Sequence, residues 1–73
     1  GRDEVHRYVE GQMQLAGAAE PIFDDSAIDA LDELSHGIPR RIGTLAVEAL
    51  TCAMFAGERT VTANTVMTVK QGG

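Results

Sequence analysis

The sequence predicts an all-α fold, a small four-helix bundle, and three observations support it. Glycine and proline residues divide the 73 residues into four segments of helical length. Hydrophobic residues recur every three or four positions within each segment, and no strand pattern is visible outside the fourth. Helices joined by such short connections pack around one core. We expect helices at residues 3–16, 25–35, 39–56 and 62–70 of a single domain that spans residues 1–73.

The first expected helix is amphipathic. Its larger hydrophobic residues, Val5, Tyr8, Val9 and Met13, fall on one stripe that we expect to face the core. Acidic residues in its first turn suit the positive end of the helix dipole.

The second expected helix has clear signals at both ends. Asp24 can cap its start by accepting hydrogen bonds from free amides of the first turn. Phe23 and Ile28 flank this cap at the spacing of a hydrophobic staple. Gly37 is the expected left-handed residue that stops the helix.

The third expected helix begins at Pro39, which is favoured in the first turn, and stops before Gly57. Its apolar residues cover more than half of its circumference, so the helix is predicted to be buried on two sides. The main stripe consists of Ile42, Leu45, Ala46, Ala49, Cys52, Ala53 and Ala56. The second side carries Val47, Leu50 and Met54, which are candidate contact residues because so short a chain has few residues to cover both sides.

The fourth segment has the staple pattern again. Thr62 is the expected N-cap, between Val61 and Val66. The segment is rich in valine and threonine, which favour strands, so a strand is the alternative to a short helix.

Composition excludes several classes of protein. The formal charge of −5 disfavours a general binder of nucleic-acid backbones. The lone Cys52 cannot form an internal disulfide, and two histidines with one cysteine make a poor zinc site. No stretch has the ~20 apolar residues of a membrane span. We therefore expect a soluble, cytoplasmic domain with no metal, and one too small to be an enzyme by itself.

Charge is unevenly distributed along the chain. Residues 1–36 carry nine acidic residues against two arginines, a balance of −7, whereas residues 37–73 have a balance of +2. Arg40 and Arg41 lie at the start of the third helix, where the dipole also favours an anion. Arg40 shares a side with Gly43, which we expect to leave room for close approach of a phosphate. The alternative is that both arginines are solvated, or paired with the acidic second helix.

The element Gly37-Ile38-Pro39-Arg40, between an acidic helix and a long alanine-rich one, resembles the sensor 2 motif of AAA+ ATPases. That motif lies in the C-terminal helical lid of the family. Further blocks in the same order resemble the branch of bacterial general-secretion ATPases of type A and transposition-helper ATPases. These blocks are Leu15-Ala16-Gly17, Pro21-Ile22-Phe23-Asp24-Asp25 and Ala56-Gly57-Glu58-Arg59-Thr60-Val61.

The resemblance implies a bundle of the AAA+ lid type in which Arg40 senses the nucleotide phosphates. Pro39 belongs to the motif, and Arg41, which follows it, is the alternative sensor. It also implies ATP and Mg²⁺ in a parent protein, a homo-oligomeric ring, and a nucleotide-binding domain as partner. The chain contains no Walker A loop, Walker B acids or sensor 1 residue, so we expect no ATP hydrolysis and no bound cofactor from it alone.

Two other functions remain in view. A free-standing helical interaction module would use Val47, Leu50 and Met54 to bind a partner helix. A helix-turn-helix DNA binder is disfavoured, because its recognition helix would be too apolar for a groove and the chain is acidic.

Overall fold

The computed structural model describes residues 1–17 and 22–72, so Pro21 of the quoted blocks lies outside the described residues. Within these ranges four helices are present, as expected for an all-α fold. They are α1 (Arg2–Ala16), α2 (Asp25–Ser35), α3 (Pro39–Phe55) and α4 (Ala63–Gly72). Two short strands that the sequence did not predict are also present, β1 (Ile22–Phe23) and β2 (Thr60–Val61). The strand alternative for the fourth segment was therefore wrong, because β2 ends at Val61 and α4 begins at Ala63.

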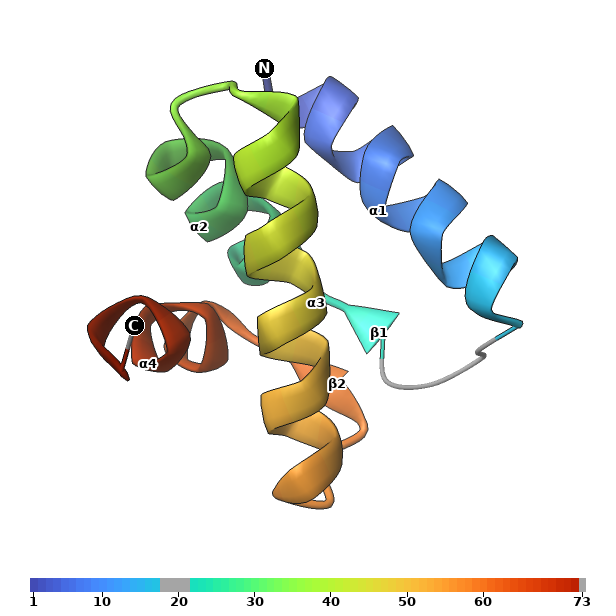
Figure 1. Ribbon diagram of the computed structural model, residues 1–73, viewed down its shortest axis with the longest axis vertical. Helices are drawn as coiled ribbons and strands as arrows, with labels where there is room; N and C mark the ends of the chain where they lie inside the picture. The colour runs from blue at the N-terminus through green and yellow to red at the C-terminus, as the bar shows by residue number, and fades with distance from the viewer. Residues whose placement is uncertain (18–21, 73) are drawn as a thin grey trace.

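Helix α3 runs through the middle of the molecule, with α1 on one side and α4 on the other (Figure 1). It is the longest helix, at 17 residues, as the sequence predicted. Helix α2 contacts α1, α3 and α4, so it closes the bundle on the side away from the viewer. Four apolar stripes thus share one core.

The two short strands pair in parallel, with Ile22 opposite Thr60 and Phe23 opposite Val61. The amide of Ile22 donates to the Arg59 carbonyl at 3.0 Å, and the amide of Asp24 donates to the Val61 carbonyl at 3.1 Å. A strand of two residues is too short to show alternation, which is why neither strand was predicted from the sequence. The pairing brings the starts of α2 and α4 together.

Side-chain hydrogen bonds strengthen this junction between the starts of α2 and α4. The Asp24 carboxylate accepts from the Ala27 amide at 2.8 Å, which confirms Asp24 as the N-cap of α2. Ser26 donates to the same carboxylate at 2.7 Å and accepts from the Ala63 amide, the first of α4, at 3.0 Å. One serine therefore serves the starts of two helices.

The second predicted cap is also present. The Thr62 hydroxyl accepts from the Thr65 amide at 3.4 Å, at the start of α4. Both flanking valines, Val61 and Val66, are fully buried. At the start of α2, Phe23 is half-buried and Ile28 buried, and both line one pocket, as a staple requires.

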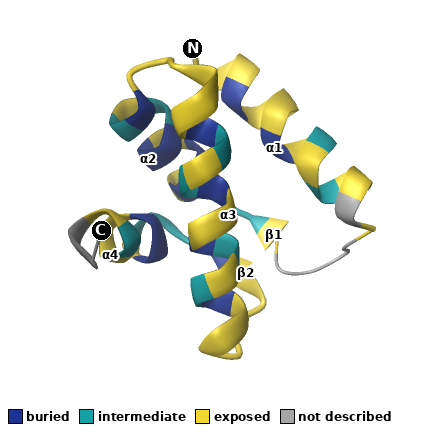
Figure 2. Ribbon diagram, viewed as in Figure 1, coloured by how far each residue is buried: buried dark blue, intermediate teal, exposed yellow. Residues whose placement is uncertain are grey.

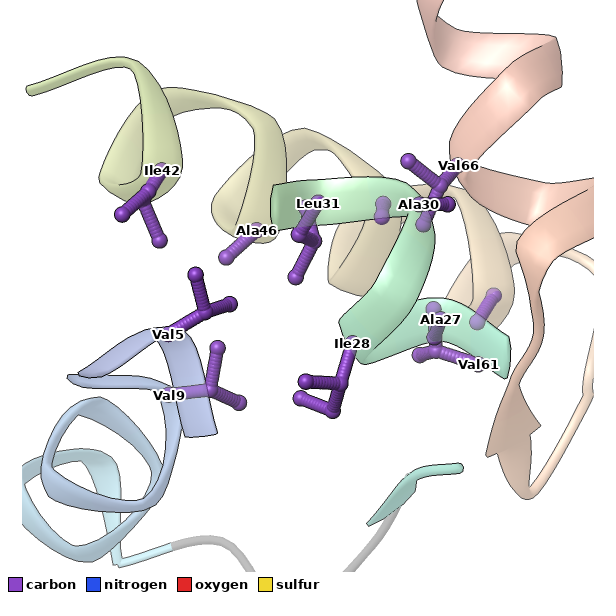
Figure 3. Close-up of a cluster of buried hydrophobic side chains, with 12 residues drawn as sticks. Val5, Val9, Ala27, Ile28, Ala30, Leu31, Ile42, Ala46, Val61 and Val66 are labelled. Carbon is purple, nitrogen blue, oxygen red and sulfur yellow. The ribbon is translucent and has the colours of Figure 1, made fainter. Parts of the chain in front are cut away.

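The buried apolar residues form one cluster to which all four helices contribute (Figure 3). Val5 of α1 points towards Ile42 and Ala46 of α3, Val9 points towards Ile28 of α2, and Leu31 of α2 lies beside Ala46. The cluster consists of Val5, Val9, Ala27, Ile28, Ala30, Leu31, Ile42, Ala46, Ala49, Ala53, Val61 and Val66.

The predicted stripes were wrong at a few positions. Tyr8 is 36% exposed, because the tyrosine lies at the edge of the α1–α3 contact. Leu45 and Cys52 are half-buried, and Ala56 is exposed beyond the last residue of α3. These residues lie at the margins of a small core. Along α3, the buried residues of that core are mostly alanines.

Helix α1 is tied to α2 by an ion-pair cluster. A terminal guanidinium nitrogen of Arg2 lies 3.1 Å from an Asp25 carboxylate oxygen, and its Nε donates to Asp29. The hydrogen bond to Asp29 raises the pKa of Arg2 above its ordinary value, with Coulombic attraction adding to it. Arg2 and Asp29 are 27 residues apart in sequence, so no local pattern predicts this contact.

Apolar side chains remain exposed along the second side of α3 (Figure 2). Val47 is 54% and Met54 62% exposed, while Leu50 is half-buried. This is the side that the sequence marked as a contact surface. None of the described helices combines the length and apolarity needed to cross a bilayer.

Leu31 tests the core directly, because its side chain is fully buried at the centre of the cluster. We expect Leu31→Ala to lower the free energy of unfolding by about 2–5 kcal/mol through the cavity that it leaves. Leu15→Ala is the matched control, since Leu15 is 88% exposed. A thermal melt in which the two variants lose equal stability would contradict this core.

Candidate functional site

The turn between α2 and α3 is built on Ser35, which is fully buried. Its hydroxyl donates to the Asp32 carbonyl and accepts from the Gly37 amide, both at 3.3 Å. Its carbonyl accepts from the Ile38 amide at 3.0 Å. The turn is therefore hydrogen-bonded to the end of α2, and this fixes where α3 begins.

Two consecutive residues of this turn are left-handed. Gly37 has φ 74°, in keeping with its expected role, but the C-cap of α2 is already His36, with φ 54°. Helix α2 therefore ends at Ser35 as predicted, and the left-handed turn after it begins one residue before Gly37. His36 is the one non-glycine residue with positive φ in the described ranges. This conformation costs energy in residues other than glycine.

Helix α3 starts without a negative charge of its own. Ile38 is the N-cap and offers no side-chain hydrogen bond, Pro39 holds the first position, and the first turn contains no acid. By contrast, α1 and α2 both have acidic first turns, and Asp24 caps α2. The positive end of the α3 dipole is therefore open to an external anion.

Arg40 and Arg41 follow Pro39 directly, and both are exposed. Neither guanidinium has an ion-pair or hydrogen-bond partner among the residues that the structure describes. The alternative that they pair with the acidic second helix is not realised, since Arg2 takes Asp25 and Asp29 instead. The Thr44 hydroxyl donates to the Arg40 carbonyl at 3.1 Å, within the helix.

Arg40 borders two clefts, one on each side of α3. The α1-side cleft, of about 480 Å³, is lined by Tyr8, Gln12, Arg40, Gly43, Thr44, Val47 and Glu48. The α4-side cleft, of about 490 Å³, is lined by Leu34, Arg40, Arg41, Thr44, Leu45, Glu48, Val69 and Lys70. Arg41 belongs to the second alone. The sequence did not single out Lys70, because 29 residues separate it from Arg41 and only the fold brings them to one cleft.

Gly43 does not leave open space beside Arg40, contrary to expectation. A Cβ at this position would lie 2.7 Å from the Tyr8 hydroxyl oxygen, so Tyr8 of α1 occupies the space. The glycine permits close packing of α1 against α3, and any phosphate must approach from beyond Tyr8. Helix spacing alone cannot show this, because the contact is between different helices.

The predicted contact residues of α3 lie below Arg40 on the α1 side. Val47 lines the α1-side cleft, and both Val47 and Leu50 line a smaller apolar pocket with Val9 and Phe23. Met54 lies one turn further on, beside the exposed Phe55. In the described part of the chain, no group of three metal-ligating side chains comes together.

Comparison with known proteins gives one relevant similarity. The chain is 38% identical over 58 residues, 80% of its length, to "General secretion pathway protein A" of Aeromonas hydrophila. The match covers 11% of that relative, so the chain corresponds to a small part of a much longer protein. No protein-family model matches the chain. No solved structure matches it either.

The Tyr8–Gly43 contact can be tested by a double-mutant cycle. Alanine favours a helix by about 1 kcal/mol over glycine. In Gly43→Ala we expect this gain to be offset, because the new methyl displaces the Tyr8 hydroxyl. In the Tyr8→Phe background, where the nearest remaining atoms are 3.4 Å away, the gain should be recovered. Equal stability changes in both backgrounds, measured by urea unfolding, would show that the contact carries no energy.

Proposed function

We propose that this chain is the helical lid of a larger AAA+ ATPase associated with secretion, and that Arg40 is its phosphate sensor. The main support is that Arg40, behind Gly37-Ile38-Pro39, is an exposed arginine without a described partner, at a helix start that lacks its own negative charge. Similarity to part of a general secretion pathway protein supports the secretion assignment over transposition.

The geometry suits binding of a phosphate across a cleft between domains. A guanidinium presents a planar fork of donors that can hold two phosphate oxygens at once. The open end of the α3 dipole adds favourable potential for the same anion. Because Ser35 anchors the preceding turn, the arginine moves with the whole lid and not alone. A phosphate held by Arg40 therefore biases the orientation of the lid.

The remaining partners follow from this proposal. A nucleotide-binding domain of the same protein supplies the Walker loops that hold ATP and Mg²⁺, and Arg40 contributes one contact to the γ-phosphate. Val47, Leu50 and Met54 then face that domain or a neighbouring subunit of a homo-oligomeric ring. This accounts for a helix that is apolar on two sides although its own bundle covers only one.

The functional test uses the full-length ATPase. Arg40→Ala should lower hydrolysis by at least about tenfold, because a charge-assisted contact is worth ~1.5–3 kcal/mol. Arg40→Lys should recover only part of the rate, since an ammonium keeps the charge but loses the fork. Steady-state ATPase assays give the rates.

Arg41→Ala is the matched control, an exposed arginine one position on, and should have a much smaller effect. If the two alanine variants reverse their order, Arg41 is the sensor. If neither changes hydrolysis, the sensor assignment is wrong. The 73-residue chain by itself should bind no ATP measurably, because most of the phosphate-binding groups lie elsewhere.

A second candidate function, a helical interaction module, is favoured by the exposure of Val47, Met54 and the 89% exposed Phe55. In this case the same surface binds a separate protein, and Arg40 has no nucleotide to contact. The two functions differ in what they require of a parent protein. A Walker A sequence upstream in the same polypeptide supports the lid, and its absence supports the module.

The contact surface itself can be tested in both settings. Val47→Asp with Met54→Asp should leave the thermal melt of the 73-residue chain nearly unchanged, since both side chains are more than half exposed. We also expect the chain to self-associate through this surface at high concentration, and the double variant should reduce that self-association in sedimentation. In the full-length protein the same pair should lower ATP hydrolysis. Unchanged hydrolysis and unchanged sedimentation together would exclude this surface as an interface.

A further inference from the structure

We propose that the α4-side cleft binds an acidic peptide segment of a partner protein that carries an apolar anchor residue. This goes beyond the proposed function and does not depend on it. The phosphate sensor requires only Arg40, whereas the cleft is also lined by Arg41 and Lys70, which the sensor role leaves unused.

The cleft has an apolar floor. Leu34 of α2, Leu45 of α3 and Val69 of α4 are half-buried and pack against the core with part of each side chain accessible. Three helices therefore contribute one hydrophobic side chain each. An apolar side chain of a ligand can be buried there, gaining about 25 cal/mol for each Å² removed from water.

The rim of the cleft is cationic in a chain that is otherwise acidic. Arg40 and Arg41 come from the first turn of α3, and Lys70 comes from the last turn of α4. The chain as a whole carries −5, so three cations around one cleft reverse the local sign. Neither Arg41 nor Lys70 has an ion-pair partner in the described ranges, so both can pair with a ligand. Complementarity of charge selects an acidic partner.

The apolar floor of the cleft distinguishes a peptide from a phosphate chain. Glu48 lines this cleft and the α1-side cleft alike, so its charge does not separate the two sides of Arg40. An acidic peptide spreads its charge over several side chains, and its backbone amides can donate to Glu48. The apolar floor favours the same ligand, because a phosphate chain has nothing to bury there. The cleft therefore fits mixed acidic and apolar side chains better than a polyphosphate or a nucleic-acid backbone.

The probe is a short dye-labelled peptide of glutamate residues with two leucines, titrated with the 73-residue chain and followed by fluorescence anisotropy. We expect binding that weakens by at least about tenfold in Arg41→Glu and in Lys70→Glu. Arg7→Glu is the matched control: Arg7 is an exposed arginine of α1, away from the cleft, and undergoes the same change of charge. It should change the affinity by less than about twofold. Circular dichroism melts should show all three variants folded, since these side chains are exposed.

Several results would overturn the proposal. These are no binding by the unchanged chain, an equal loss in Arg7→Glu, or unaltered affinity when serine replaces the leucines of the probe. Inorganic tripolyphosphate that binds the cleft more tightly than the peptide would show a phosphate site instead. The sensor proposal is judged separately by ATP hydrolysis. An Arg40→Ala enzyme that remains active defeats the sensor, whereas loss of peptide binding in Arg41→Glu and Lys70→Glu supports the cleft whatever that enzyme does.

Discussion

The pairing of β1 with β2, together with Ser26, is the constraint on which the rest of the domain depends. It fixes the starts of α2 and α4 at one point, although 38 residues separate Asp25 from Ala63. Helix α3 then packs across both, and beyond Ile42 its buried side carries the small residues Ala46, Ala49 and Ala53. The candidate site depends on the same arrangement, because Ser35, at the end of α2, hydrogen-bonds the turn that precedes Arg40.

Local signals in the sequence predicted most of the fold, and physical chemistry explains why. Caps such as Asp24 and Thr62 act over three residues, so they can be read from the chain alone and are present as predicted. The helical periods are equally local. The errors were the two-residue strands and the margins of the stripes, where burial depends on which helix lies opposite.

The candidate site was predictable only in part. Arg40 and Arg41 could be found because a helix start and its flanking turn leave a local pattern. Lys70 in the same cleft, and Tyr8 over Gly43, could not be found, because each contact joins separate helices. Interactions of this kind can be found only from the tertiary arrangement. The same arrangement shows that Gly43, which we expected to leave open space, packs against Tyr8.

Arg40 lines the clefts on both sides of α3, together with Thr44 and Glu48. If each cleft holds a ligand, a ligand that binds the guanidinium on one side makes it less available to the ligand on the other side. Linkage is reciprocal: if one ligand lowers the affinity of the other by some factor, its own affinity is lowered by the same factor. Ligands on opposite sides of this helix that compete for the arginine are therefore antagonists without ever touching.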